Sequence, residues 1–438
     1  MPALRKPDTW AGTTGSPATL TAVRRSPSSA SAYAVHPVRP GVRDPTSTKG
    51  SSATVARVML VYGTRPEAIK MAPVVRALGE SADIEPVVAV TGQHREMLDQ
   101  VHELFGIRPD HDLAILAARQ TLGQVTTRAL TGLEPLVAEV APDAVVVQGD
   151  TTTTFAGALA AFYAQVPVVH LEAGLRTDNR YSPFPEEINR RLTTELATLH
   201  LAPTPVNRAH LEAGGVAPEA ITVTGNTVID ALFEVAGRRP AYTDPDLART
   251  VDAAAAGGRR LVVVTAHRRE SWGEPMRGSF RAVAEVARAH PDTDFVFPVH
   301  RNPVVREVAA AELSAEPNVL RTEPLSYAEF AHLLGSAHLV VTDSGGVQEE
   351  APSLGKPVLV LRDTTERPEA VTAGTVRLVG TDRATVRDAL TELLDDDKAY
   401  AAMAGAVNPY GDGKAAVRSV AAIEELLGLG VRLPDFTG

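Results

Sequence analysis

Three carboxylates stand where they could act as acid and base catalysts. Asp150 and Glu172 each follow an apolar run directly, and Glu186 follows a proline-rich loop. The places of the three carboxylates fit paired acid and base work, and their spacing alone leaves open whether they converge on one site. Each also has an ordinary interpretation. Asp150 would cap a helix that begins at Thr151, Glu172 would form a loop salt bridge, and Glu186 would be a first-turn helix acid.

Two histidines follow apolar runs in the second half of the chain and have basic neighbours. His267 precedes Arg268, and His300 precedes Arg301. Imidazoles beside carboxylates can bind a divalent metal, but no HxH or HExxH spacing is present, so we expect no metal. A single histidine is usually structural. The position of both residues at predicted strand ends favours a role in a cleft.

A glycine-containing turn opens a predicted helix after the run 339–342. Its residues Ser344, Gly345 and Gly346 would present free backbone N–H groups at a helix N-terminus, without a Cβ to block a phosphate. Glu350 would lie in the same helix, where its carboxylate could accept two hydrogen bonds from a ribose diol. The alternative is an ordinary glycine turn followed by an exposed acid.

A second predicted turn, at 63–70, is basic. Gly63 permits the turn, Pro66 suits a first helical position, and Arg65 and Lys70 could contact phosphate oxygens. Each cation could equally be a solvated surface charge.

Six apolar runs, each followed at once by charged or small polar residues, position these groups. They are 58–62, 144–148, 261–265, 295–299, 339–342 and 357–361. In open parallel α/β sheets ligands bind outside the carboxyl ends of the strands. The sequence therefore predicts a cleft for an anionic, hydroxyl-rich ligand.

The runs alternate with helical patterns, which indicates βαβ units and parallel sheets. We predict an α/β fold of two doubly wound Rossmann-like domains, over 55–228 and 229–414, with a C-terminal helix in 415–438 that crosses back to the first domain. Residues 1–54 are rich in Ser, Thr, Pro and Ala and lack a periodic apolar pattern, so we expect a disordered tail.

The composition excludes several classes of function. The chain has 438 residues, a net charge of -10 and no cysteine. Without cysteine there are no disulfides, thiol catalysis or thiolate-bound metals. The negative charge argues against a nucleic-acid partner, and no apolar run is long enough to span a membrane. The first residues lack the apolar core of a signal peptide, so we expect a cytoplasmic protein.

Ten segments in consistent order, from about Arg57 onward, resemble the non-hydrolysing UDP-N-acetylglucosamine (UDP-GlcNAc) 2-epimerases of bacteria. They are GTRPEAIKMAPVV (63–75), TGQHREMLDQV (91–101), QGDTTTTFAGALAAFY (148–163), HLEAGLRT (170–177), YSPFPEEINRRL (181–192), TGNTVIDAL (224–232), HRRES (267–271), PVHRNP (298–303), TDSGGVQEEAPSLGKPVLVLRDTTERPEAV (342–371) and NPYGDG (408–413).

The resemblance implies a glycosyltransferase-B type fold, a homodimer, and interconversion of UDP-GlcNAc and UDP-N-acetylmannosamine (UDP-ManNAc) without a cofactor. It also implies which residues form the site. The catalytic positions are Asp150, Glu172, Glu186 and His267, and the substrate-binding positions are Arg65, Lys70, His300, Ser344, Gly345, Gly346 and Glu350.

A second substrate site is implied by likeness to members that their own substrate activates. The residues that match it are Gln93, His94, Glu96 and Arg119, and Glu96 stands where some of those members carry Gln.

Chemistry limits the mechanism, because the C2 proton of the sugar has no adjacent carbonyl to make it acidic. The bond from C1 to phosphate must loosen first, so we expect elimination of UDP to give 2-acetamidoglucal. Return of a proton to the opposite face of C2 and re-addition of UDP would then give the inverted product. Two rivals share the fold. One is a hydrolysing epimerase that releases ManNAc and UDP, and the other is a UDP-sugar glycosyltransferase.

Overall fold

The computed structural model describes residues 55–92, 95–117, 119–177 and 179–438. The predicted tail 1–54 and the predicted second-site residues Gln93 and His94 lie outside the described residues. Residues 53–438 group into one compact unit that holds two parallel sheets. Among the described helices, none is both long and apolar enough to cross a bilayer.

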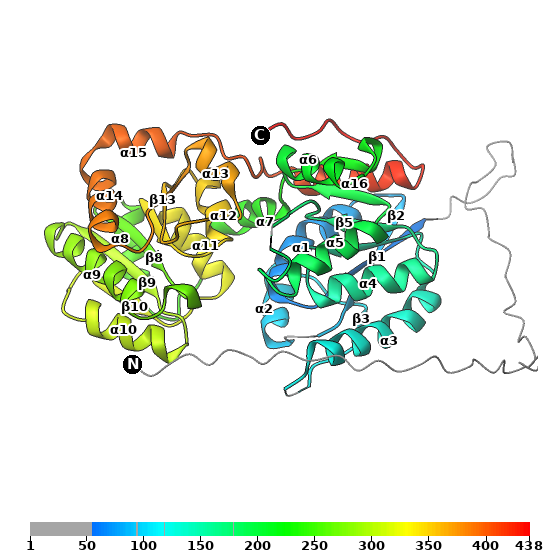
Figure 1. The fold of residues 1–438 in the computed structure, drawn as a ribbon, viewed down its shortest axis with the longest axis horizontal. Helices are drawn as coiled ribbons and strands as arrows, with labels where there is room; N and C mark the ends of the chain where they lie inside the picture. Colours follow the sequence, from blue (N-terminus) through cyan, green and yellow to red (C-terminus); the bar gives the residue numbers. More distant parts are fainter. Residues whose placement is uncertain (1–54, 93–94, 118, 178) are drawn as a thin grey trace, which may run out of the picture. The chain divides into compact units, whose positions relative to one another are not determined.

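The first sheet has seven parallel strands in the order β3-β2-β1-β4-β5-β6-β7 (Figure 1). Its strands are β1 (Ala56–Tyr62), β2 (Ile84–Val90), β3 (His111–Asp112), β4 (Ala144–Gln148), β5 (Val168–Leu171), β6 (Leu199–Ala202) and β7 (Ile221–Val223). The central strands β1, β4 and β5 are almost entirely buried, which their runs of valine and leucine require when helices cover both faces.

The second sheet has six parallel strands in the order β10-β9-β8-β11-β12-β13. They are β8 (Arg260–Thr265), β9 (Thr293–Pro298), β10 (Val319–Thr322), β11 (Leu339–Thr342), β12 (Val358–Val360) and β13 (Val376–Leu378). All six apolar runs of the sequence therefore form strands, and the predicted α/β architecture with two parallel sheets is confirmed.

Helices connect the strands of the first sheet. They are α1 (Arg65–Gly79), α2 (Arg95–Phe105), α3 (Leu122–Val140), α4 (Thr152–Tyr163), α5 (Glu186–Leu196), α6 (Pro205–Ala213) and the 3-10 turn η1 (Pro218–Ala220). Local signals fix several starts. Thr64 and Glu67 form a capping box at α1, with Pro66 in its first turn, and the Thr151 hydroxyl accepts the N–H of Thr154 at α4.

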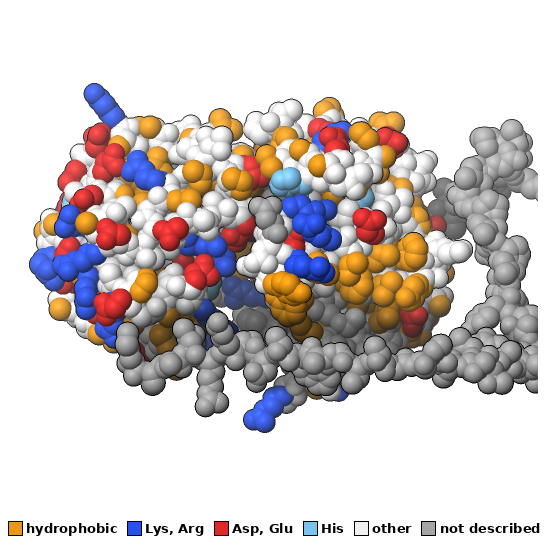
Figure 2. Space-filling model, viewed as in Figure 1, with side chains coloured by type: hydrophobic (Ala, Val, Ile, Leu, Met, Phe, Trp, Pro, Cys, Tyr) orange, Lys and Arg blue, Asp and Glu red, His pale blue; other side chains and the backbone are white. Residues whose placement is uncertain are grey.

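The second sheet has a matching set of helices. They are α8 (Pro245–Ala255), η2 (Arg269–Ser271), α9 (Glu274–Ala289), α10 (Pro303–Leu313), α11 (Tyr327–Ser336), α12 (Val347–Ser353), α13 (Pro368–Ala373), α14 (Arg383–Asp395) and α15 (Asp397–Ala404). Figure 2 shows acidic and basic side chains interspersed over the visible face, as the mixed composition leads one to expect.

Two further helices tie the halves together. α7 (Thr227–Ala236) packs against α1 of the first half and against α11 and α12 of the second. α16 (Ala415–Leu426) follows the second sheet in sequence but packs on α1, α7 and β6. One cluster of buried side chains contains residues from both sheets, among them Leu60 and Val263. The boundaries of the two predicted domains stay predictions.

Strand register brings the candidate residues together. Gln148, the last residue of β4, pairs with Leu171 of β5, so Asp150 and Glu172 leave the sheet side by side. In the second sheet Thr265 of β8 pairs with Thr342 of β11, which sets His267 beside Asp343.

Candidate active site

Asp150 follows β4 and is held by an arginine from α5. Arg190 Nε donates to Asp150 Oδ2 over 3.0 Å, and Nη2 of the same guanidinium donates to the same oxygen. Asn189 Nδ2 also donates to the Asp150 carbonyl oxygen over 3.0 Å. The capping interpretation of Asp150 is wrong, because the neighbouring Thr151 caps α4. The Asp150 carboxylate is therefore an ion-pair partner whose side chain stays 25% exposed.

Glu172 is the most enclosed of the three candidate carboxylates. Its oxygens accept hydrogen bonds from Lys70 Nζ, from Gln148 Nε2 and, over 3.2 Å, from Asn226 Nδ2. Burial acts to raise the pKa of Glu172, but the Lys70 ammonium and these hydrogen bonds hold it below its usual range. The Glu172 backbone has a φ of 63°, a left-handed conformation that few non-glycine residues adopt. Glu172 is thus kept ionised in a fixed, strained position.

Lys70, for which the sequence suggested a phosphate contact, is the cation of the ion pair with Glu172. Burial acts to lower the pKa of Lys70, but Glu172 and then Glu349 raise it above its usual value. The ammonium is therefore charged and directed at Glu172. Its predicted contact with a diphosphate stays a prediction.

Glu186 is the first residue of α5, as its alternative interpretation expected. Its side chain is half-buried and forms no hydrogen bond or ion pair with any other described residue. Its neighbour Glu187 behaves differently. The Glu187 side chain is fully buried and accepts from Arg190 over 3.2 Å and from Arg191 over 2.6 Å. Arg190 therefore links Asp150 to the first turn of α5, where Glu186 lies.

A polar chain continues from Glu172 into the second half of the molecule. Asn226 Nδ2 donates to Glu349 Oε2 over 2.6 Å as well as to Glu172, and Arg367 Nε donates to Glu349 Oε1 over 2.5 Å. Asn226 caps α7 through its side-chain oxygen, so its amide group is oriented by the helix. Lys70, Glu172, Asn226, Glu349 and Arg367 form one continuous network.

His267 and His300 lie together, as their positions after β8 and β9 predicted. Their rings stack with centroids 5.8 Å apart. His267 Nδ1 is 3.0 Å from Oδ1 of the buried Asp343, whose Oδ2 accepts the backbone N–H groups of His267 and Arg268 over 2.7 and 2.8 Å. Burial acts to raise the pKa of Asp343, but His267 and the two N–H groups keep it low. Burial and the charge of His267 lower the pKa of His300.

The turn Ser344–Gly346 has a steric reason for its glycine. A Cβ on Gly345 would lie 2.6 Å from Arg367 Nη1, so only glycine fits beside this guanidinium without displacing it. Ser344 N donates to Thr342 Oγ1 over 2.9 Å, which fixes the start of the turn.

Glu350 follows in α12 as a buried carboxylate. Burial, followed by the charge of Glu349, raises the pKa of Glu350 to about 7, while Lys70 and Arg65 act in the opposite direction. The alternative of an exposed acid is therefore wrong for Glu350.

Arg65 begins α1 and lines a cavity of 320 Å³ together with Ser326, Tyr327 and Ala328 from the start of α11 and four residues of α2. The charge of Arg65 acts on Tyr327 and on Glu350, which puts these three groups in one region. Arg119 is exposed, with a φ of 57°, and Glu96 lies in the first turn of α2.

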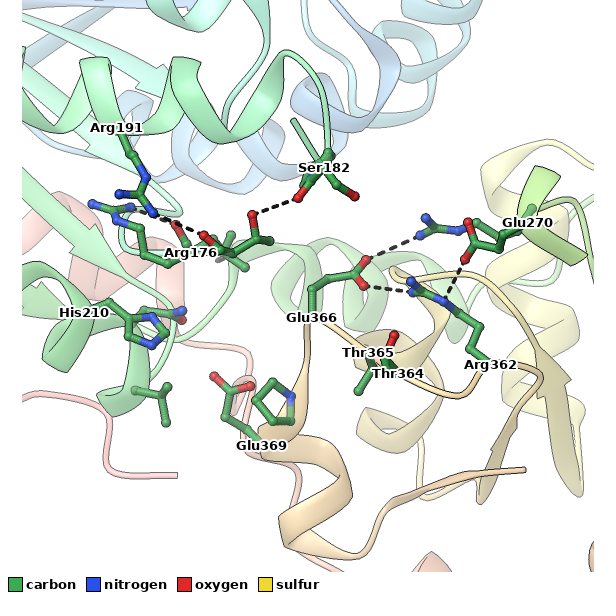
Figure 3. Close-up of a pocket in the computed structure, with 17 residues that line it drawn as sticks. Arg176, Ser182, Arg191, His210, Glu270, Arg362, Thr364, Thr365, Glu366 and Glu369 are labelled. Carbon is green, nitrogen blue, oxygen red and sulfur yellow. Dashed lines mark hydrogen bonds and ion pairs between the residues drawn. The ribbon is translucent and has the colours of Figure 1, made fainter. Parts of the chain in front are cut away.

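A larger cavity of 630 Å³ is lined by residues of both halves (Figure 3). Arg176, Arg191 and His210 come from the first half, and Glu270, Arg362, Glu366 and Glu369 come from the second. Glu366 accepts from Arg362 over 2.8 Å and from Arg268 over 3.4 Å. Of the described residues that line this cavity, none is a predicted site residue. It neighbours the site through Arg268, next to His267.

Several residues that hold the site have no local signal in the sequence. Arg190 and Asn226 were not singled out, and neither were the roles of Gln148 and Arg367. Their only signal was their presence inside segments of the family resemblance. Within the described parts of the chain, no three His, Asp or Glu side chains gather in a way that could hold a metal ion.

Comparison with known proteins agrees with this architecture. Residues 76–424 match the sequence profile of the family described as UDP-N-acetylglucosamine 2-epimerase. The enzyme of that name from Escherichia coli K12 is 52% identical over 382 residues, which cover 84% of this chain and 98% of the relative. The Bacillus subtilis enzyme is 50% identical over 386 residues, covering 87% of this chain and 99% of its own.

A solved structure extends the likeness to the fold. The Neisseria meningitidis UDP-GlcNAc 2-epimerase, bound to UDP-GlcNAc, superposes with a TM-score of 0.76 at 46% identity, over 85% of this chain and 100% of that one. The two parallel sheets thus form the glycosyltransferase-B type architecture of these enzymes. The chain belongs to the UDP-N-acetylglucosamine 2-epimerase family.

Proposed function

We propose that this chain is a non-hydrolysing isomerase that interconverts UDP-GlcNAc and UDP-ManNAc. The observation that carries the proposal is the identity of 50 to 52% with enzymes named for this epimerisation, along 98 to 99% of their own length. Physical support comes from the register of β4 and β5, which Asp150 and Glu172 follow, from the buried Lys70 that donates to Glu172, and from Arg190, which links Asp150 to the first turn of α5.

The nucleotide would bind mainly to the second half. Glu350 would accept the ribose hydroxyls, and the backbone N–H groups of Ser344, Gly345 and Gly346 would contact the diphosphate together with Arg65 and His300. A carboxylate with a pKa of about 7 is partly neutral at physiological pH, so enclosing it under a ribose costs less than enclosing a full charge.

Departure of UDP needs stabilisation of the negative charge that develops on the diphosphate. His267 is suited to this role, because Asp343 holds its Nδ1 and leaves Nε2 for the ligand. A protonated imidazole there would interact with the leaving phosphate oxygen more strongly in the transition state than in the ground state.

The carboxylates would move the C2 proton. As UDP leaves, C1 becomes cation-like and the C2 proton becomes acidic enough for a carboxylate to remove, which gives 2-acetamidoglucal. Inversion then needs a proton donor on the opposite ring face. Asp150 and Glu172 are held by cations, whereas Glu186 has no partner among the described residues, so the three groups differ in how freely they can approach the sugar.

We propose three finer properties as well, and two of them, the homodimer and the activation by substrate, follow only from the family resemblance. The protein would be a cytoplasmic homodimer, and UDP-GlcNAc bound near Gln93, His94, Glu96 and Arg119 would activate it. Activation would make the rate rise sigmoidally with UDP-GlcNAc, and a trace of UDP-GlcNAc would accelerate the reaction of UDP-ManNAc. Hyperbolic kinetics in both directions would contradict the second site.

Product analysis tests the main proposal. Incubation with UDP-GlcNAc, followed by proton and phosphorus NMR, should give an equilibrium mixture with UDP-ManNAc and no growing pool of free sugar. Accumulation of ManNAc and UDP would instead identify a hydrolysing epimerase. Sugar transfer to an added acceptor, with no UDP-ManNAc formed, would identify a glycosyltransferase.

A further inference from the structure

Glu67 is a buried carboxylate that joins two loops far apart in the sequence. Its side chain is 2% exposed. Oε2 accepts the backbone N–H groups of Gly63 over 2.9 Å and of Thr64 over 2.7 Å. Oε1 accepts the hydroxyl of Thr151 over 2.5 Å and that of Thr154 over 3.0 Å. Both oxygens are therefore fully used inside the protein.

The four donors lie next to residues that the proposed function uses. Thr64 precedes Arg65, and Thr151 follows Asp150. The Thr154 hydroxyl also lies 2.6 Å from the carbonyl oxygen of Gln148, whose side-chain amide donates to Glu172. One carboxylate is thus in contact with the loop of Arg65, the predicted phosphate ligand, and with the loop of Asp150, a candidate acid–base group.

Capping alone does not explain this arrangement. In a capping box the glutamate needs only to accept the backbone N–H of the cap residue, which a surface carboxylate can do at little cost. Burial raises the pKa of Glu67, and the hydrogen bonds that its two oxygens accept oppose this rise only while both loops keep their positions. Because Oε2 accepts from Gly63 and Thr64 and Oε1 accepts from Thr151, the Glu67 side chain fixes the distance between the two loops.

We propose that Glu67 is a positioning residue that holds Arg65 and Asp150 at the spacing that the reaction requires. The inference rests on the proposed function, because that function gives Arg65 and Asp150 their roles. Glu67 contacts no substrate itself. It acts through the two loops, so its removal should affect both UDP binding and proton transfer.

The chemistry of the bridge predicts how conservative changes behave. In Glu67→Gln the amide oxygen can still accept both backbone N–H groups, and the amide N–H groups can donate to the two threonine hydroxyls. The Thr154 hydroxyl can then donate to the Gln148 carbonyl. Glu67→Gln should therefore keep the bridge, whereas Glu67→Ala removes it.

The test combines kinetics with double-mutant cycles. Glu67→Ala should lower kcat/KM by about a hundredfold, the size of effect expected when catalytic groups move by an ångström. Glu67→Gln should stay within about tenfold of the wild type. In an Asp150→Asn background, Glu67→Ala should lower kcat by no more than about threefold, because the group it positions is already disabled. In an Arg65→Ala background, Glu67→Ala should likewise change the Kd for UDP by no more than about threefold.

A matched control is Glu329, which forms the same kind of capping box at α11. Glu329 accepts from Ser326 N over 2.9 Å and from Thr243 Oγ1 over 3.1 Å, and it is also buried. Glu329→Ala should lower the melting temperature, yet its effect on kcat should be additive with Asp150→Asn.

Three results would overturn the proposal, provided that the wild type epimerises. They are additive effects of Glu67→Ala and Asp150→Asn, wild-type kinetics of Glu67→Ala, and equal losses for Glu67→Gln and Glu67→Ala. If Glu67→Ala does not fold, Thr151→Val breaks the same bridge from the other side, with Thr151→Ser as its control, and the same non-additivity is required. A wild type without epimerase activity would refute the proposed function instead.

Discussion

Glu172 and Glu350 are two buried carboxylates, one beside each sheet, and their pKa values are shifted in opposite directions. Glu172 has the Lys70 ammonium and two amide donors, and its pKa is held below the usual range despite burial. Glu350 follows Glu349, which already pairs with Arg367, and the pKa of Glu350 rises to about 7. Burial is the largest influence on the pKa of both carboxylates and acts on them in the same direction, so the difference between them comes from their charged and hydrogen-bonding neighbours.

This difference in pKa indicates that the two halves of the molecule have different roles in the proposed reaction. Near the first sheet, Glu172 and Asp150 have internal cationic partners, Lys70 and Arg190. Fixed charges of this kind suit groups that must stabilise a cation-like sugar without reorganising. Near the second sheet, Glu350 and the Ser344–Gly346 turn provide hydrogen-bonding groups for a ligand that is bound alike before and after the reaction.

The largest loss of activity is expected for variants of the candidate acid–base residues near the first sheet. Glu172→Gln, Asp150→Asn and Glu186→Gln should each slow interconversion by about a hundredfold or more, because acid–base groups typically contribute factors of this size. Steady-state assays of purified, folded variants measure the loss. The exposed Glu85, which pairs with Arg57 on the surface, provides a control in Glu85→Gln. A kcat near the wild-type value in Glu172→Gln would show that catalysis does not need the charge of Glu172. The proposed difference in role between Glu172 and Glu350 would then be wrong.

The next prediction concerns Glu350 and the pH dependence of stability. The pKa of Glu350 in the folded protein, about 7, exceeds its ordinary value of 4.5, so the protonated side chain is the form that folding favours. The associated stability is complete below pH 4.5 and is lost as the pH rises through 7. The loss should reach up to about 3 kcal/mol and should be absent in Glu350→Gln.

Urea unfolding of both proteins between pH 4.5 and 8 measures this difference. The wild type should lose stability relative to Glu350→Gln as the pH rises. A difference between the two proteins that does not change with pH would show that Glu350 titrates normally.

The smallest expected effect sharpens the binding role of Glu350. Because the ribose contact is made alike in the ground state and the transition state, Glu350→Gln should raise KM and the Kd for UDP by about tenfold while kcat changes much less. Calorimetric titration with UDP gives the Kd directly. An unchanged Kd would exclude Glu350 from the nucleotide site.

The strands and their polar ends were predictable because the physical signal is local. A buried parallel strand needs a run of apolar residues, and a polar residue directly after it marks the carboxyl edge of the sheet. That rule located Asp150, His267 and the turn at Ser344. Proline and glycine signals likewise predicted a helix that begins near Pro66 and another that begins after Gly346, where α1 and α12 lie.

The partners of these residues were not predictable, because they depend on contacts between distant segments. Arg190 donates to Asp150, which lies 40 residues before it in the sequence. Asn226 donates to Glu172 and also to Glu349, which lies 123 residues after Asn226. A lone arginine or asparagine in a helix has no local signature for such a contact. For the same reason Lys70 suggested a phosphate ligand, whereas its ammonium is directed at Glu172.

In the proposed mechanism the C2 proton leaves the sugar and a proton from solvent replaces it, which exchange with heavy water detects. UDP-GlcNAc incubated with the enzyme in D2O should acquire deuterium at C2, and proton NMR should find the label in both UDP-GlcNAc and UDP-ManNAc. Glu172→Gln should suppress the exchange together with turnover. Interconversion without deuterium at C2 would contradict elimination and re-addition, and with it the proposed use of the carboxylates.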